Sequence, residues 1–286
     1  MLTDYTLSNT KETAGKILFY PPNQMQLAWE DIKQGILKWR LWFMLAYQDI
    51  KLRYRRSVLG PFWLTISMAI TVYSMGYLYS YLFHMDMYHY FPYLTTGMLG
   101  WSLISTTLTD LIEAFSSPEG MLKQIKLPYS IYVHRVATRN LVIFFHNLLI
   151  MIPIFIIFHE VVQVNLCIFL IIPGLFLIYF NAFCYGLTLS MIGARFRDIS
   201  QMIKSLIQVA FFITPVMWKP DILPISKRFI ATFNPFYAFI ELIRAPLLGH
   251  APTISNLSIV LFFSLAGIML SYFVFPKRRA RIIYWI

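Results

Sequence analysis

Long apolar segments recur through this chain, and most of its charged residues lie between them. We predict membrane spans at residues 62–83, 92–115, 141–158, 166–192, 201–218 and 254–275. A helix needs about 20 apolar residues to cross the hydrocarbon core of a bilayer, where its backbone groups must bond one another. Only 13% of the residues are charged, against about 25% in an average soluble domain. We therefore expect an all-α membrane protein with six transmembrane helices.

Four basic side chains directly precede the first apolar segment, at Lys51, Arg53, Arg55 and Arg56. Because Lys and Arg are retained on the cytoplasmic side of a membrane, their distribution predicts orientation. The termini and the loops at 116–140 and 193–204 hold 20 of the 24 Lys and Arg, and residues 219–253 hold the other 4. Both termini are therefore predicted to be cytoplasmic, the second as a basic tail at 276–286.

Residues 24–56 carry an apolar stripe at helical spacing. Its positions are three or four residues apart, at Trp29, Ile32, Ile36, Trp39, Phe43, Tyr47 and Ile50. Charged residues lie off this stripe, so we expect an amphipathic helix in the headgroup plane rather than a helix packed on a soluble domain. Residues 1–23 are polar, and the first 25 residues show no signal-peptide pattern. We expect a surface-lying tail there, and insertion that begins at the first span.

The segment at 220–253 is apolar in two short stretches, which are broken at Asn234-Pro235. Each stretch is too short to cross about 30 Å of hydrocarbon. Short helices of this kind occur as re-entrant or interfacial elements. We expect re-entrant half-helices between spans five and six, within one permease domain at 57–275.

Few residues suggest an enzyme. His84, Asp86 and His89 lie close together, but a metal site would need three ligands with supporting contacts, and their loop is short and aromatic. Asp110 and Glu113 share one helix face. Ionisable groups in a span are functional candidates, although a position near the membrane edge would also let water solvate them. We predict no metal site and no catalytic residue.

Three tyrosines on the first span suggest a transport path. Tyr73, Tyr77 and Tyr81 recur at every fourth residue, on one helix face. A ring with a hydroxyl group suits the lining of a conduit for sugars, and an aromatic belt at the membrane interface is the alternative. The sequence has no phosphate-binding loop, so ATP-driven transport would need a separate ATPase. The net charge of +11 reflects charges at the ends of spans, and we expect no nucleic-acid partner.

Five motifs resemble those of the membrane subunits of ABC-2 type polysaccharide exporters, especially the O-antigen permeases. They are the run at 49–63, Lys126-Leu127-Pro128, Arg195-Phe196-Arg197-Asp198-Ile199, Thr214-Pro215-Val216 and Asn234-Pro235-Phe236. They follow in the family's order from about residue 27 onward, and residues 1–23 have no counterpart. The resemblance implies a homodimeric permease of the bacterial inner membrane with two cytoplasmic ATPase subunits.

The cargo that the resemblance implies is a polysaccharide linked to undecaprenyl pyrophosphate. ATP and Mg would bind the partner ATPase, and this chain would carry no cofactor. Because a fold does not determine its cargo, a capsule or teichoic-acid exporter, a small-molecule or drug exporter and a membrane-embedded transferase remain alternatives.

The resemblance also assigns candidate residues to sites. The entrance, where the lipid pyrophosphate would bind, comprises Arg53, Arg55, Arg56, Ser57, Leu59 and Gly60. Guanidinium groups suit phosphate oxygens, although these arginines could also serve topology alone. The ATPase-coupling loop at 116–130 comprises Ser117, Glu119, Gly120, Lys123 and Lys126. The outer gate at 220–253 comprises Asn234, Pro235, Phe236 and Tyr237.

Overall fold

The computed structural model describes residues 23–57, 59–60, 62–82, 84–162 and 165–286, and within these ranges the chain is helical without strands. The longer helices are α1 (Gln24–Leu37), α2 (Trp39–Arg53), α3 (Phe62–Leu82), α4 (Met87–Ile112), α6 (Tyr129–Asn147), α8 (Ile171–Arg195), α9 (Arg197–Ile213), α11 (Pro235–Leu247) and α12 (Ile254–Arg278). The shorter ones are α5 (Glu119–Gln124), α7 (Met151–Ile157), α10 (Phe229–Thr232) and α13 (Ile282–Trp285). The all-α class is confirmed.

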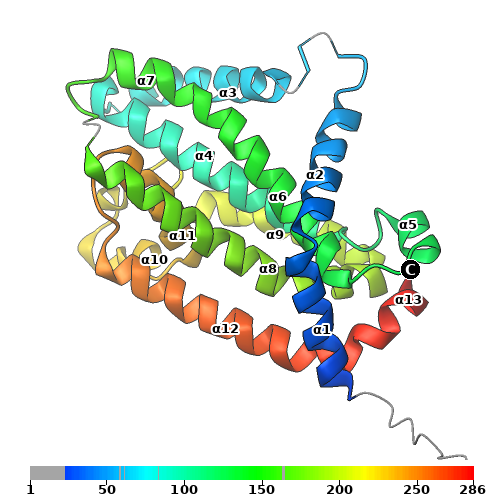
Figure 1. The fold of residues 1–286 in the computed structure, drawn as a ribbon. Coiled ribbons are helices and arrows are strands. Elements are labelled where there is room, and N and C mark those ends of the chain that lie inside the picture. Colours follow the sequence, from blue (N-terminus) through cyan, green and yellow to red (C-terminus); the bar gives the residue numbers. More distant parts are fainter. Residues whose placement is uncertain (1–22, 58, 61, 83, 163–164) are drawn as a thin grey trace, which may run out of the picture.

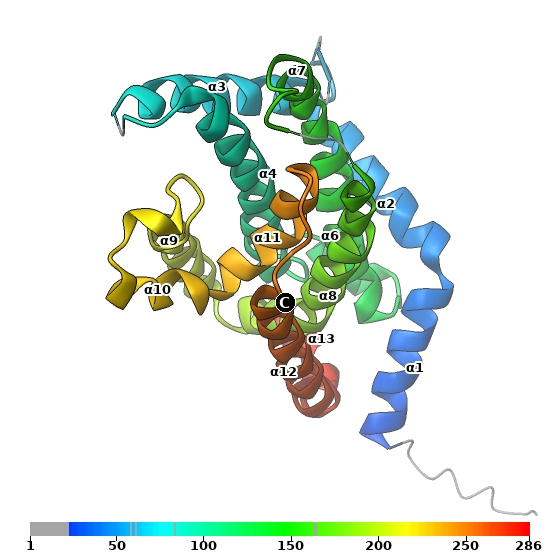
Figure 2. The ribbon, with the colours of Figure 1, turned by 90° about the vertical axis from the view of Figure 1, so that its left-hand side faces the viewer.

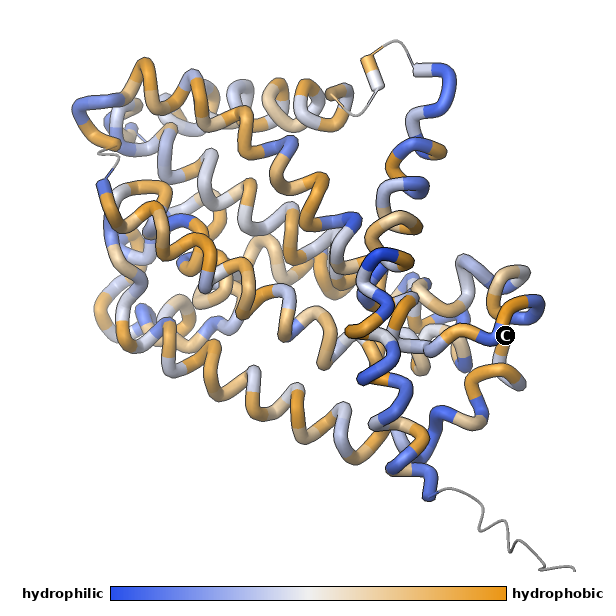
Figure 3. The backbone as a smooth tube through the Cα atoms, viewed as in Figure 1, coloured by the Kyte–Doolittle hydropathy of each residue, from blue (hydrophilic) through white to orange (hydrophobic). Residues whose placement is uncertain are grey.

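Two ends of the bundle can be distinguished (Figure 1). The α5 end carries α1, α2, α5 and α13, and the α7 end carries α7 and α10. Helices α3, α4, α6, α8 and α12 run between these ends, whereas α1 and α2 cross the bundle at a steep angle. Viewed from the α7 end, α9 and α10 lie on one side of the bundle and α1 and α2 on the other (Figure 2). Hydrophilic residues are dense on α1 and α2 and around the last helix (Figure 3).

Among the described residues, three helical stretches are long and apolar enough to cross a membrane: Tyr129–Ile157, Leu166–Arg195 and Ile254–Trp285. They contain the fourth and sixth predicted spans and all but the last residue of the third. The tyrosines of α3 and the threonines, serines and glycines of α4 dilute the hydropathy of these helices, and α9 is 17 residues long. The six-span count and the re-entrant half-helices therefore stay predictions.

Helix α6 begins at Tyr129, well before the predicted start of the third span at residue 141. Arg135 and Arg139 made residues 129–140 resemble a basic loop, and that interpretation was wrong. Both side chains are largely buried, at 19% and 15% exposed, and both form ion pairs with carboxylates. A paired charge can lie within a helix at little cost, whereas an unpaired one would favour a hydrated loop.

The predicted amphipathic helix is present but is divided at Lys38 into α1 and α2. The break leaves the carbonyl of Gly35 without its usual helical partner, and the indole Nε1 of Trp42 donates to it at 3.1 Å. Gly35 lies so close to Ser130 of α6 that a Cβ atom there would overlap the serine side chain. Much of the apolar stripe is exposed in a single chain, including Trp29 at 72%.

Helix α4 is central to the packing. It contacts α3, α6, α8, α9 and α11, and its buried side chains contribute to all three hydrophobic clusters of the described residues. Leu99 and Leu103 belong to the cluster nearer the α7 end, Leu111 to that at the α5 end, and Trp101 and Ile104 to the one shared with α9. A movement of α4 would therefore displace most of the bundle.

Candidate functional site

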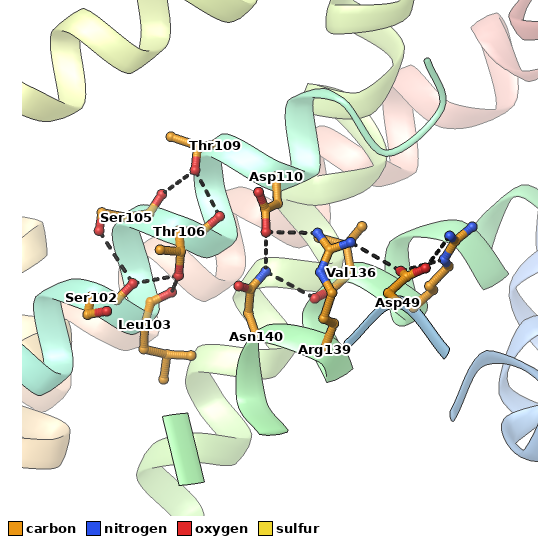
Figure 4. Close-up of polar contacts among 11 residues, drawn as sticks. Asp49, Ser102, Leu103, Ser105, Thr106, Thr109, Asp110, Val136, Arg139 and Asn140 are labelled. Carbon is orange, nitrogen blue, oxygen red and sulfur yellow. Dashed lines mark hydrogen bonds and ion pairs between the residues drawn. The ribbon is translucent and has the colours of Figure 1, made fainter. Parts of the chain in front are cut away.

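Asp49 of α2 belongs to an ionic cluster that links α2 to the bundle, with Arg139 between Asp49 and Asp110 (Figure 4). Asp49 Oδ1 accepts a hydrogen bond from Arg135 Nη2 at 2.5 Å, and Asp49 Oδ2 accepts bonds from Arg135 Nε at 2.8 Å and Arg139 Nη1 at 3.1 Å. Arg139 Nη2 donates to Asp110 Oδ2 of α4 at 2.8 Å, and Asn140 Nδ2 donates to the same oxygen at 3.0 Å. We call these five residues the ionic cluster. It joins α2, α4 and α6 by charge-assisted hydrogen bonds.

A cavity of about 120 Å³ adjoins the ionic cluster. Its walls are formed by Arg53, Asp110, Glu113, Ala114, Ser117, Pro118, Arg135, Val136 and Arg139. Arg53 was predicted at the entrance and Ser117 in the coupling loop. The structure therefore brings one candidate residue of the entrance and one of the coupling loop to the wall of the same cavity.

Asp31 of α1 is a buried carboxylate at the α5 end. Its Oδ2 accepts from the backbone N–H of Tyr129 and from Arg279 Nε, both at 3.0 Å, and its Oδ1 accepts from the N–H of Ser130 at 2.9 Å. The first N–H groups of a helix have no partner within that helix. Asp31 therefore caps α6 from a different helix, and its charge faces the positive end of the α6 dipole.

Toward the α7 end, Arg244 of α11 is buried, with 1% of its surface exposed. Its Nη1 donates to Glu241 Oε1 at 2.9 Å and to the Tyr93 hydroxyl of α4 at 3.0 Å. Its Nη2 donates to the carbonyls of Pro215 at 2.9 Å and Val216 at 3.1 Å. The guanidinium carbon lies 3.9 Å from the centroid of the Tyr93 ring, within the range of a cation–π contact.

Residues 214–218 follow α9 in a non-helical conformation. Pro215 disfavours a helical conformation at Thr214, which is extended, so α9 ends at Ile213. The carbonyls of this segment are bonded by side chains of other helices, since Tyr90 Oη donates to Met217 O at 2.8 Å and Tyr93 Oη to Trp218 O at 3.1 Å. We call Tyr93, Glu241, Arg244 and residues 214–218 the Arg244 cluster. It joins α4, α9 and α11.

The family model described as ABC-2 type transporter matches residues 40–248, which include the ionic cluster and the Arg244 cluster. This chain belongs to the ABC-2 type transporter family. An O-antigen export system permease protein, RfbA, of Klebsiella pneumoniae is 22% identical over 83% of this chain and 92% of its own length. A second Klebsiella pneumoniae protein of that name is 23% identical over 69% of this chain and 76% of its own length. An RfbA of Myxococcus xanthus is 23% identical over 61% of this chain and 66% of its own length.

The coupling residues predicted for an ABC-2 permease lie on and around α5. Lys123 Nζ lies 2.6 Å from Glu119 Oε1, and its hydrogen bond lowers the pKa of the Glu119 carboxyl. Leu122 is buried in the hydrophobic cluster at the α5 end, whereas Gly120, Ser117 and Lys126 are exposed. Helix α5 is thus attached through Leu122 and its partly buried neighbour Met121, and it presents polar groups outward. Its coupling role stays a prediction.

The entrance residues predicted for an ABC-2 permease form the connection between α2 and α3. Arg55, Arg56, Ser57 and Leu59 are exposed, and Arg53 reaches the cavity beside the ionic cluster. Gly60 has a φ of 56°, in the left-handed region that favours glycine. Residues 58 and 61 of this connection lie outside the described residues. The phosphate-binding role stays a prediction.

The predicted outer gate meets the Thr214-Pro215-Val216 motif in space. Asn234 Oδ1 accepts from the N–H of Tyr237 and so caps α11, and Asn234 Nδ2 donates to Thr214 Oγ1, both at 3.2 Å. Pro235 occupies the first position of α11, where its missing N–H costs nothing. The ring of Phe236 lies edge-on to Trp101 of α4, with centroids 5.7 Å apart. The gating role of these residues stays a prediction.

The three tyrosines predicted to line a channel lie in two environments. Tyr73 is half-buried, and its hydroxyl donates to the carbonyl of Ile150 at 3.0 Å. Tyr77 and Tyr81 are exposed, at 59% and 63%, and their rings pack edge to face at 5.0 Å. In a single chain they do not line one surface as a set, and their channel role stays a prediction.

The carboxylates considered as alternatives are paired. Asp110 belongs to the ionic cluster, and Glu113 accepts from Lys204 at 2.6 Å and from Ser200 at 2.7 Å. Asp86 caps α4 and lies 2.5 Å from His89. Within the described residues, no group of three or more His, Cys, Asp or Glu side chains could hold a metal ion.

Sequence reasoning missed the polar residues that hold the helices together. Arg244 was counted as an outer-loop charge, and Asp31 and Tyr93 were assigned no role. The signal for Arg244 was a charge pair, Glu241 and Arg244, three residues apart inside an otherwise apolar stretch. Such a pair shares a helix face and, at membrane depth, must find buried partners.

Proposed function

We propose that this chain is the permease subunit of an ATP-driven exporter of O-antigen polysaccharide linked to undecaprenyl pyrophosphate, in the bacterial inner membrane. The observation that carries the proposal is the extent of its similarity to the Klebsiella pneumoniae RfbA, 83% of this chain and 92% of that permease. A likeness over nearly the whole length supports a shared function more strongly than one motif would.

The working unit is a homodimer with two ATPase subunits, which bind ATP and Mg. Apolar faces of α3 and α9 support a second copy. Their exposed side chains include Ile66, Ile70, Leu78, Met202, Leu206, Val209 and Phe212. Six spans are few for enclosing a polymer path, and a dimer with two-fold symmetry would double the number of helices around it.

The lipid pyrophosphate is bound at the predicted cytoplasmic entrance. The planar guanidinium groups of Arg53, Arg55 and Arg56 can each form paired hydrogen bonds with phosphate oxygens. The exposure of all three in the described structure supports this role. Arg53 also lines the cavity beside the ionic cluster, so substrate arrival at the entrance could be sensed where α2, α4 and α6 meet.

Force from ATP hydrolysis enters through α5. Leu122 of α5 packs in the same hydrophobic cluster as Leu111 of α4 and Phe115 just after it, which supports transmission from α5 to α4. Because α4 contacts most of the bundle, its displacement would open the path.

The proposal is tested by co-expressing the chain with the neighbouring ATPase and purifying the complex. We expect a two-plus-two assembly whose ATP hydrolysis changes when lipid-linked O-antigen is added. Lys123→Ala, which removes the exposed cation of α5, should weaken this response, whereas Glu160→Gln, an exposed change near the α7 end, should leave it intact. A chain that purifies without any bound ATPase would contradict the proposal.

A further inference from the structure

Side chains from α4 and α11 bond most of the carbonyls of the segment at 214–218. Four consecutive carbonyls, from Pro215 to Trp218, accept hydrogen bonds from Arg244, Tyr90 or Tyr93. A carbonyl released at a helix end and buried from water must find a partner. The position of this segment therefore depends on donors that other helices supply.

Arg244 is the central donor of this arrangement. Its two terminal nitrogens bond α11 through Glu241, α4 through Tyr93, and residues 214–218 through two carbonyls. Gly97 makes room for it, because a Cβ atom there would overlap the guanidinium group and the Val216 carbonyl. Lysine could not substitute, since an ammonium group lacks the planar fork that reaches several acceptors at once.

The contacts of the Arg244 cluster have features that would allow them to break and re-form. They are hydrogen bonds to a run of similar backbone carbonyls, so a shift along the segment can exchange one acceptor for the next. The Nε of Arg244 is buried without a partner among the described residues. A buried donor that lacks a partner raises the energy of this state relative to any state in which it is bonded.

Helix α4 connects the Arg244 cluster with the α5 end. Tyr93 and Asp110 lie on the same continuous helix, about 25 Å apart along its axis. Asp110 belongs to the ionic cluster, and the predicted coupling loop follows α4 directly. An axial or rotational shift of α4 that begins at the α5 end would therefore move the Tyr93 hydroxyl relative to Arg244.

We propose that Arg244 is the positioning residue that holds residues 214–218 in the closed state of the transport path, and that movement of Tyr93 on α4 releases them. This inference rests on the proposed function, because a path that opens and closes belongs to a transporter. It identifies Arg244 as the residue that controls closure of the path on the side away from the ATPase. It also identifies α4 as the helix that transmits the conformational change.

The test uses Tyr93→Phe in the full-length chain, because this change keeps the ring and removes only the hydroxyl. Liposomes containing the purified protein are loaded with a small fluorescent anion, and its leak is followed without ATP. We expect leak to increase about five-fold or more, because each lost hydrogen bond changes the closed-to-open ratio by about this factor and the hydroxyl forms two, one from Arg244 and one to Trp218. The Arg244→Lys variant should also leak, because the lysine ammonium cannot replace the several hydrogen bonds that the planar guanidinium donates.

The matched control is Tyr88→Phe, five residues earlier, where the side chain is 52% exposed. Its leak should equal that of the unaltered chain. Hydrogen exchange at residues 214–218 is measured on the same samples. Faster exchange with unchanged leak in Tyr93→Phe would overturn the proposal, because the contacts would then be structural only, and unchanged exchange and leak would overturn it too. The assay needs no ATPase and no polysaccharide, so it fails independently of the proposed function.

Discussion

At the scale of single residues, paired charges set the positions of the helices. Asp49 pairs with two arginines of α6 through its one carboxylate, and its side chain is 11% exposed. Removing one partner of a shielded ionic network leaves the others without compensation, which costs more than the network's net stabilisation. The effect of losing Asp49 should therefore exceed that of losing an ordinary surface charge.

We expect Asp49→Asn to destabilise the protein by about 2 kcal/mol, the order of a charge-assisted hydrogen bond lost from a shielded site. The matched change Asp198→Asn, at an exposed carboxylate, should have little effect. Thermal unfolding of the detergent-purified chain, followed by tryptophan fluorescence, compares the two. Equal midpoints for both variants would show that the ionic cluster does not hold α2 on the bundle.

Asp86 should make stability depend on pH. Its hydrogen bonds from His89 and from the Tyr88 N–H hold the pKa of the carboxyl below its ordinary value of 3.8. A carboxyl whose pKa is lower in the folded state stabilises the protein above its unfolded pKa, and this contribution disappears as pH falls through the lowered value. Asp86→Asn should therefore lower the unfolding midpoint at pH 7, and its difference from the unaltered chain should shrink as the pH falls below 3.8. A difference as large below pH 3.8 as at pH 7 would contradict this.

At the scale of elements, periodicity predicts helices well but not where they break or begin. The stripe from Trp29 to Ile50 indicated one helix, yet its apolar spacing continues without a change through Lys38, where the structure divides it into α1 and α2. The start of α6 was misplaced because Arg135 and Arg139 find their partners on α2 and α4, more than 25 residues away in sequence. Pairing across helices is not visible in a local pattern.

Gly35→Ala should separate α1 from α6. The added Cβ atom would overlap the Ser130 side chain, and relief of that overlap would disturb the Asp31 bonds that cap α6. Overpacking of this kind costs about 1–3 kcal/mol. Gly120→Ala is the matched control, because no atom lies within 4 Å of its Cβ position. Thermal unfolding should distinguish them, and equal stability would mean that α1 tolerates displacement from α6.

At the scale of the whole molecule, the structure alters which basic residues count toward orientation. Arg244, one of the four assigned to the outer loops, is buried in the Arg244 cluster, so three basic residues remain in the loops predicted to lie opposite the termini. Arg135 and Arg139 no longer count among the loop cations on the side of the termini, because they are paired inside the bundle. The bias that predicts cytoplasmic termini persists after both corrections, since the termini alone hold most of the remaining cations.

Two exposed positions at opposite ends of the bundle can test this orientation. Ile225 is 85% exposed between α9 and α10, and Tyr284 is 84% exposed in α13. With Cys167→Ser and Cys184→Ser removing both native thiols, we expect Ile225→Cys to react with a membrane-impermeant maleimide in intact spheroplasts. Tyr284→Cys should react only after lysis, because α13 follows the sixth predicted span, which would return the chain to the cytoplasmic side. Reaction of both before lysis would place the two positions on one side, and the alternation of spans on which the exporter proposal depends would then be wrong.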